Sequence, residues 1–182
     1  MKNYQYIPRY TYADYAQWEG NWELIYGYPH SMSPSPLKSH QRVGKKLLGK
    51  IDELLETETG CKDCELFYEL DWIVSKETTV RPDLMIVCGE MKEDFLTFSP
   101  TLVIEILSAS TTLKDRHIKY ELYEAQGVKY YVLINPETKS TEIFELINEK
   151  YVSNNSINNF TLHNNCKLSF DICSFVKQLE LN

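Results

Sequence analysis

The sequence lacks a long hydrophobic run, a signal-peptide pattern and an even number of cysteines. Without a long apolar segment, a membrane-spanning helix is not expected. An odd cysteine count without a signal for secretion favours reduced thiols in a cytoplasmic compartment over a framework of disulfides. The five cysteines are Cys61, Cys64, Cys88, Cys166 and Cys173.

A complete set of zinc ligands is also missing. Cys61 and Cys64 form a single CxxC motif. A structural zinc site needs four ligands, and no second cysteine pair or suitably spaced histidine pair accompanies this motif. A redox CxxC would stand at a strand-to-helix turn, whereas this one precedes a predicted strand. We therefore interpret Cys61 and Cys64 as small turn residues.

Positive charge is in short supply. The 19 lysines and arginines face 26 aspartates and glutamates, which gives a net charge of −7. This balance argues against a protein whose whole surface grips nucleic acid, because such binding depends on neutralising phosphates. A local basic cleft, or a metal ion that supplies positive charge, stays compatible with it.

The length and composition fit one folded domain. The chain has 182 residues, of which 43% are hydrophobic and 25% are charged. This is enough to bury a substantial core without cross-links. We expect one domain over 1–182, with a core over about 10–146 and a C-terminal hairpin and helix over 147–182.

The periodicity of apolar residues predicts a mixed α/β (α+β) fold. Helical spacing predicts helices over 11–18, 37–56, 111–125 and 170–181. Alternating or continuous apolar runs predict strands over 22–28, 65–74, 80–88, 101–107, 129–135, 141–146, 150–153 and 160–162. A short connection makes 65–74 and 80–88 antiparallel, and a helical crossover makes the strand 129–135 parallel to its neighbour. The expected core is αβββαβ, a mixed central sheet flanked by helices.

Two of these apolar runs each contain one carboxylate. Asp83 lies in VRPDLMIV and Glu105 lies in TLVIEILSAS. An ionised carboxylate in apolar surroundings is disfavoured unless it is paired, hydrogen-bonded or bound to a cation. If the two strands are neighbours, both side chains can turn toward one point. Alternatively, Asp83 simply begins a strand and accepts hydrogen bonds from backbone amides after Pro82.

A divalent metal ion suits this pair of carboxylates. Mg²⁺ prefers oxygen ligands, keeps several waters, and is usually held by one or two carboxylates plus a substrate phosphate. A bound metal polarises a phosphodiester and lowers the pKa of an attacking water. A nearby ammonium group can stabilise the charge that develops on phosphorus. Pro82 belongs near a strand end, where a site can open.

Three further residues are candidates with ordinary alternatives. Glu23 lies in the predicted strand 22–28, where it is either near the site or a solvated strand residue. His40 shares the apolar face of the helix 37–56, where it either points into the cleft or is a satisfied core residue. Lys119 lies four residues after Asp115, and an exposed pair at that spacing is ordinary and contributes only about 0.3–0.5 kcal/mol.

The motifs resemble those of the PD-(D/E)XK nuclease superfamily, and more narrowly the Uma-type restriction endonuclease family. Pro82-Asp83 matches the PD half, and Glu105-Ile106-Leu107 occupies the (D/E)XK half. The stretches that carry the Uma-type resemblance are WELIYGYPHSMSPSP, VRPDLMIV, LVIEILSASTTLKDRHIKYELY and GVKYYVLINPE. The resemblance implies a DNA-cleaving hydrolase that uses Mg²⁺ or Mn²⁺.

The same resemblance assigns roles to individual residues. It implies that Asp83 and Glu105 are metal ligands and that Lys119 is the catalytic ammonium. Lys119 would replace the motif lysine, since Leu107 stands in its usual position. Glu23 and His40 would be accessory catalytic residues.

Three function classes compete for this sequence. The leading prediction is a metal-dependent endonuclease that acts on DNA as a homodimer or higher homo-oligomer, because cutting both strands of a symmetric duplex favours two sites related by a twofold axis. The second is a catalytically silent nuclease fold that serves as a binding or assembly module, which the net acidity and Leu107 favour. The third is a hydrolase of small phosphoesters.

Overall fold

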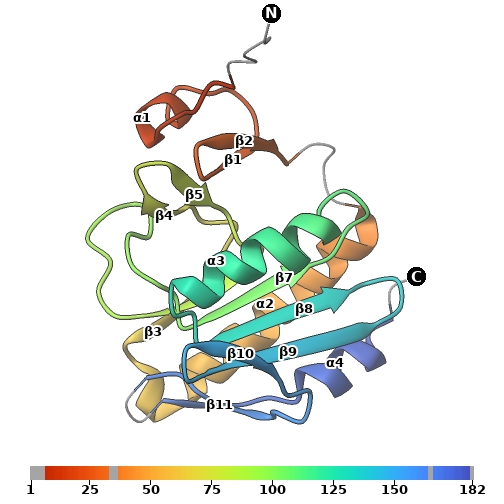
Figure 1. Cartoon of the computed structure of the whole chain (residues 1–182). Helices are drawn as coiled ribbons and strands as arrows, with labels where there is room; N and C mark the ends of the chain where they lie inside the picture. The colour runs from red at the N-terminus through yellow and green to blue at the C-terminus, as the bar shows by residue number, and fades with distance from the viewer. Residues whose placement is uncertain (1–6, 33–36, 164–165, 181–182) are drawn as a thin grey trace, which may run out of the picture.

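A six-stranded mixed sheet forms the centre of the protein (Figure 1). The computed structural model describes residues 7–32, 37–163 and 166–180. The strand order is β10-β9-β8-β7-β6-β3, and β7 and β8 are parallel while the other neighbours are antiparallel. The strands are β3 (Cys64–Tyr68), β6 (Leu84–Cys88), β7 (Leu102–Ile106), β8 (Tyr130–Asn135), β9 (Ser140–Ile147) and β10 (Lys150–Ser153).

Helices cover both faces of this sheet (Figure 1). On one face, α2 (Lys38–Thr57) and α4 (Ile172–Gln178) pack into one apolar cluster with the sheet. On the other face lies a continuous helical segment that consists of the π-helix η2 (Lys114–Lys119) and α3 (Tyr120–Ala125). The central strands are apolar on both sides because both sides are covered.

The element order confirms the predicted αβββαβ core. It runs α2, β3, β6, β7, η2 with α3, and β8. The crossover from β7 to β8 passes through η2 and α3, which gives the parallel pair the length of connection that it needs. Gly127 ends α3 with a φ of 77°, in the left-handed region that favours glycine.

A second sheet of four strands lies against one end of the main sheet (Figure 1). Its order is β2-β1-β5-β4, and all its pairs are antiparallel. The strands are β1 (Trp22–Ile25), β2 (Tyr28–Ser31), β4 (Trp72–Ser75) and β5 (Thr78–Val80). The short helix α1 (Tyr12–Tyr15) precedes it and begins with the expected capping box of Thr11 and Asp14.

The second sheet corrects the extent of two predicted strands. The range 65–74 is not one strand, because Glu69 adopts a φ of 51° and the chain turns there. Its first part is β3 of the main sheet, and its second part is β4 of the other sheet. The range 22–28 likewise contains β1, a turn at Tyr26 and Gly27, which both have positive φ, and the first residue of β2.

The predicted strand 80–88 is also interrupted. Val80 ends β5 and Leu84 begins β6, so the irregular stretch 81–83 connects the two sheets. Pro82 occupies this stretch, and it cannot donate a hydrogen bond to a strand ladder. The expectation that Pro82 marks a strand end is confirmed, and Asp83 directly precedes β6.

The C-terminal part adds a small hairpin to the core. Strands β9 and β10 form the predicted hairpin at the edge of the main sheet. Strand β11 (Asn159–Thr161) corresponds to the predicted strand 160–162. It pairs with β12 (Lys167–Ser169), a strand that the sequence analysis did not predict. Within the described ranges, no helix is long and apolar enough to cross a membrane.

The interpretation of the cysteines is wrong. Cys61 forms a disulfide with Cys166, and Cys64 forms one with Cys88, while Cys173 is free. Cys64 and Cys88 face each other in the β3–β6 ladder. Four of the five cysteines form two disulfides. The two cysteines of the CxxC motif bond to distant partners and not to each other.

Candidate active site

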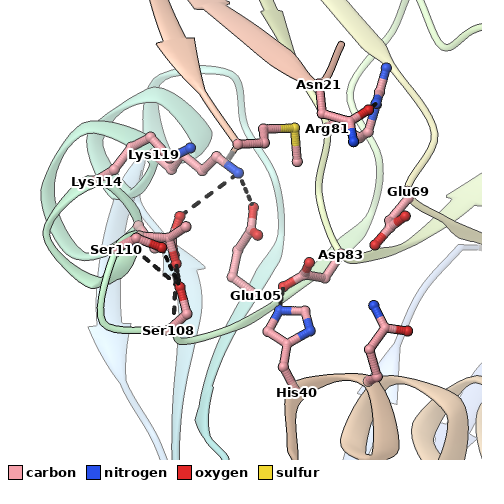
Figure 2. A pocket seen from close by; sticks show the side chains of 14 residues that line it. Asn21, His40, Glu69, Arg81, Asp83, Glu105, Ser108, Ser110, Lys114 and Lys119 are labelled. Carbon is pink, nitrogen blue, oxygen red and sulfur yellow. Dashed lines mark hydrogen bonds and ion pairs between the residues drawn. The ribbon is translucent and has the colours of Figure 1, made fainter. Parts of the chain in front are cut away.

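A pocket of about 390 Å³ opens where the two sheets meet (Figure 2). It is lined by Glu105 from the end of β7 and by Asp83, which directly precedes β6. The helix α2 contributes His40, and η2 contributes Lys114, Asp115 and Lys119. The pocket is rich in charge although it lies beside the apolar core.

The structure brings Asp83 and Glu105 to the same pocket. Leu84 pairs with Ile104 in the antiparallel ladder, so one step further along this register places Asp83 opposite Glu105. The Oδ2 atom of Asp83 accepts a hydrogen bond of 2.7 Å from the backbone N–H of Ile106. The donor belongs to the neighbouring strand β7 and is not one of the backbone amides after Pro82 that the alternative interpretation expected.

Lys119 reaches this point from the helix that follows β7. Its Nζ atom lies 2.8 Å from Oε1 of Glu105 and 2.7 Å from Oε1 of Glu23. Lys119 and Asp115 are each 2% exposed, so the alternative interpretation of an ordinary exposed ion pair is wrong. Figure 2 shows the Lys119 side chain directed toward Glu105.

Glu23 is fully buried, and the alternative of a solvated strand residue is wrong. Its carboxylate accepts from Lys114, from Lys119 and, at 2.9 Å, from the backbone N–H of Arg81. Burial alone would raise the pKa of Glu23, but the two ammonium groups outweigh it and lower that pKa to about 2. Glu23 thus holds both lysines in place from the second sheet.

His40 is both a buried helix residue and a neighbour of the carboxylates. Its Nε2 atom lies 3.2 Å from Oδ2 of Asp83, and the residue is 5% exposed. Burial lowers the pKa of His40, but the hydrogen bond and the charge of Asp83 outweigh it, so the pKa is raised. No described residue provides a hydrogen-bond partner for Nδ1 of His40.

The π-helix explains how two lysines and one aspartate face the same pocket. In an α-helix, residues five apart point about 140° away from each other around the axis. In a π-helix, residues five apart are joined by the main-chain hydrogen bond and lie one turn apart. Lys114 and Lys119 therefore both reach Glu23, and Asp115 lies between them on the pocket side.

Glu105 is surrounded by donors and by other carboxylates. Its Oε1 atom accepts from Lys119 and, at 2.8 Å, from the hydroxyl of Tyr123. Burial first, and then the charges of Asp115, Asp83 and Glu23, raise the pKa of Glu105 to about 8, although Lys119 opposes them. The sequence analysis missed Tyr123, Asp115 and Lys114. Tyr123 was counted as an apolar helix position, and only its place one turn after Lys119 could have signalled a polar role.

The donor set fits a divalent cation. Four buried carboxylates, those of Glu23, Asp83, Glu105 and Asp115, face two ammonium groups, those of Lys114 and Lys119. Burial and the neighbouring carboxylates raise the pKa of Glu105, and a bound cation would favour its ionised form. The buried Oδ1 atom of Asp115 also has no hydrogen-bond partner among the described residues.

The site suits a metal ion that keeps most of its bound waters. In the part of the chain that the structure describes, no three histidine, cysteine, aspartate or glutamate side chains converge closely enough to enclose a metal. Asp83 and Glu105 could hold Mg²⁺ as two carboxylate ligands, with water and substrate oxygen completing the shell.

The fold and this acidic pocket define a protein of the restriction-endonuclease-like class. A family model described as "Putative restriction endonuclease" (Uma2) matches residues 12–165, and the chain belongs to this family. The resemblance drawn from the motifs is confirmed.

A solved structure supports the same fold. It is the crystal structure of a "putative nuclease belonging to DUF820" from Anabaena variabilis ATCC 29413, which superposes with a TM-score of 0.68. The two proteins are 16% identical, and the match covers 91% of this chain and 98% of the other. At this identity the likeness establishes the fold. A search of curated proteins finds no match.

Proposed function

We propose that the protein is a metal-dependent nuclease that hydrolyses DNA phosphodiester bonds with Mg²⁺ or Mn²⁺. The observation that carries this proposal is the convergence of Asp83 and Glu105 on one pocket, with the ammonium of Lys119 bonded to Glu105. Membership of a family described as restriction endonucleases supports it.

Each residue of the site has a part in this proposal. Asp83 and Glu105 would hold the cation, which when bound polarises the phosphate and acidifies a water. Lys119 stabilises negative charge that develops on the phosphate oxygens. Glu23 fixes the Lys119 ammonium by an ion pair of 2.7 Å, and His40 orients the carboxylate of Asp83.

Lys119 can serve where the superfamily motif has a different lysine. Leu107, which occupies the motif position, packs in the apolar cluster beneath η2 and α3. The ammonium of Lys119 comes from the next element and contacts Glu105 directly. What matters for the chemistry is the position of the charge in space and not its position in the sequence.

The test combines cleavage with metal binding. Plasmid and single-stranded DNA are incubated with Mg²⁺ or Mn²⁺ and the parent protein, Asp83→Asn or Glu105→Gln. We expect cleavage by the parent and a loss of at least roughly 100-fold in both variants. Glu145→Gln on β9 is the matched control, because it removes a carboxylate that does not line the pocket.

Thermal melting with and without metal separates the competing functions. Stabilisation of the parent by Mg²⁺, absent in both variants, together with cleavage of DNA supports the proposal. The same stabilisation without cleavage of any substrate supports the binding or assembly module, which Leu107 and the charge of −7 favour. Cleavage of small phosphoesters alone would identify the third class.

We further propose that the protein acts as a homodimer in a cytoplasmic compartment. A twofold pair of sites suits a symmetric duplex. Sedimentation of the purified protein with and without duplex DNA measures the assembly, and a monomer under both conditions would contradict it. The two disulfides are the observation against a reducing compartment, and counting the thiols of protein alkylated during lysis tests this part of the proposal.

A further inference from the structure

We propose that Arg81 binds a backbone phosphate of the nucleic-acid strand that lies over Asp83 and Glu105. This inference rests on the proposed nuclease function and names a substrate contact within the same pocket. Arg81 lines the pocket and stands two residues before Asp83, separated from it by Pro82.

One edge of the Arg81 guanidinium is anchored. Its Nε atom donates a hydrogen bond of 2.7 Å to Oδ1 of Asp71. Asp71 in turn accepts from the hydroxyl of Tyr15 at 3.0 Å. The hydrogen bond to Asp71, together with the charge of Asp71, outweighs burial and raises the pKa of Arg81, so the guanidinium keeps its charge. The plane of the group is therefore fixed before a ligand arrives.

The other edge of the guanidinium has donors to spare. Nη1 is 3.4 Å from Oδ1 of Asn21, and Nη2 is 3.5 Å from the hydroxyl of Tyr15, which are long contacts. The group carries five N–H donors, and these contacts with the bond to Asp71 account for three. The Arg81 side chain is 25% exposed, so solvent and ligands reach it.

Arg81 differs in this respect from the lysines of the pocket. The ammonium groups of Lys114 and Lys119 are bonded to Glu23, and their side chains are 11% and 3% exposed. Figure 2 shows Arg81 on the side of the pocket opposite these lysines, with Asp83 and Glu105 between them. Of the cationic side chains that the structure describes in the pocket lining, Arg81 is the most exposed.

A phosphodiester fits these donors. A guanidinium presents parallel N–H groups that match two oxygens of one phosphate, whereas an ammonium acts as a point charge. A strand whose scissile phosphate lies at Asp83 and Glu105 passes Arg81 on its way out of the pocket. In a chain with a net charge of −7, a pre-oriented arginine at this point would supply much of the local affinity.

The competing account is that Arg81 only ties the two sheets together through Asp71 and Tyr15. Salt dependence separates the two accounts. A phosphate contact releases counterions from duplex DNA, so its loss lowers the slope of log affinity against log salt by about 0.9. An internal ion pair contributes nothing to that slope.

The experiment measures binding of a fluorescent duplex over a series of salt concentrations, with Ca²⁺ in place of Mg²⁺ and a gel to show that the duplex stays intact. We expect Arg81→Gln to weaken binding roughly tenfold and to lower the slope by about 0.9. Arg81→Lys should keep the slope and recover only part of the affinity. Arg116→Gln is the matched control, because Arg116 pairs with Glu142 outside the pocket.

The variant Asp71→Asn distinguishes a loss of phosphate binding from an effect on folding alone. It removes the anchor but keeps the positive charge, so we expect weaker binding with an unchanged slope. A slope for Arg81→Gln equal to that of the parent, in a parent that binds and cleaves DNA, would overturn the role of Arg81 alone. A parent that neither binds nor cleaves DNA would overturn the proposed function, and this inference with it.

Discussion

Glu23 shows that a buried charge can be a positioning device. The residue is fully buried, yet it stays ionised because Lys114 and Lys119 donate to it from η2. If one charged partner of such a buried ion pair is removed, the remaining charges stay uncompensated in an apolar environment. The stability of the protein at low pH therefore depends on Glu23.

Glu23→Gln should reduce the loss of stability in acid. The pKa of Glu23 is lowered from 4.5 to about 2 in the folded protein, so its contribution is present above the unfolded pKa and is lost as the pH falls toward the folded pKa. Between pH 5 and pH 3 the parent should lose about 2 kcal/mol through this group, and the variant should not. Urea unfolding without metal at both pH values measures the difference.

Glu105 does not interfere with this measurement. Its pKa is raised to about 8, so its contribution to stability is present at low pH and is lost as the pH rises from its ordinary value toward the raised one. That window begins at pH 4.5 and overlaps the interval used for Glu23, but Glu105 is present in both proteins, so the difference between parent and variant reports on Glu23. Equal losses between pH 5 and pH 3 in parent and variant would contradict the role of Glu23.

Tyr123→Phe should weaken metal binding while leaving the core intact. The Tyr123 hydroxyl donates to Glu105, and groups that orient a metal ligand affect affinity by roughly tenfold or more. The Tyr123 ring stacks on Trp72, and phenylalanine would keep that contact. Thermal shift against Mg²⁺ concentration measures the affinity, and Tyr151→Phe, whose hydroxyl bonds to the backbone of Val128, is the control.

At the scale of elements, the π-helix η2 decides which side chains meet the strands. The sequence pattern predicted an ordinary helix over 111–125, and the helix is present. The sequence pattern did not reveal the π-helix, because the spacing of apolar residues over six positions does not distinguish a π-helix from an α-helix. The exposed ion pair of Asp115 and Lys119 was the alternative to a catalytic role for Lys119, and the structure excludes that alternative because both residues are buried.

Deletion of His117 should misplace the pocket side chains of η2 while the helix itself still forms. His117 is an exposed residue of η2, and its loss would shift Lys114 and Asp115 by one position relative to Lys119. A misplacement of about 1 Å can cost roughly 100-fold in rate. We expect the far-ultraviolet circular dichroism to be retained and cleavage to fall by about that factor. His117→Ala should behave like the parent, and a deletion variant as active as the parent would contradict the role of η2.

At the scale of the whole molecule, the αβββαβ order could be predicted because it depends on local periodicity and connection length. The convergence of Asp83 and Glu105 could be anticipated because neighbouring antiparallel strands bring their ends together. The break at Glu69 could not, since it depends on a left-handed backbone at a residue that carries no glycine signal. The pairing of Cys61 with Cys166, which are 105 positions apart, could not be deduced from local sequence either.

The disulfides predict a low thiol count and a sensitivity to reduction. Under denaturing conditions without reductant, a thiol-reactive dye should label one cysteine, Cys173. Reduction should lower the free energy of unfolding by roughly 2–5 kcal/mol for each cross-link, because the bonds close long loops in the unfolded chain. Cys64→Ser with Cys88→Ser should show the same loss without reductant. Five labelled cysteines in protein alkylated during lysis would show that the bonds are absent in the cell.

The attachment of the four-stranded sheet determines how the protein loses activity on heating. Glu23 reaches Lys119 from β1, while Asp83 and Glu105 belong to the main sheet and its margin. Mild warming that detaches the smaller sheet would leave the larger sheet folded, but the Lys119 ammonium would lose Glu23 and keep only its bond to Glu105. Inactivation would then begin several degrees before the bulk transition, and cooling alone would restore it.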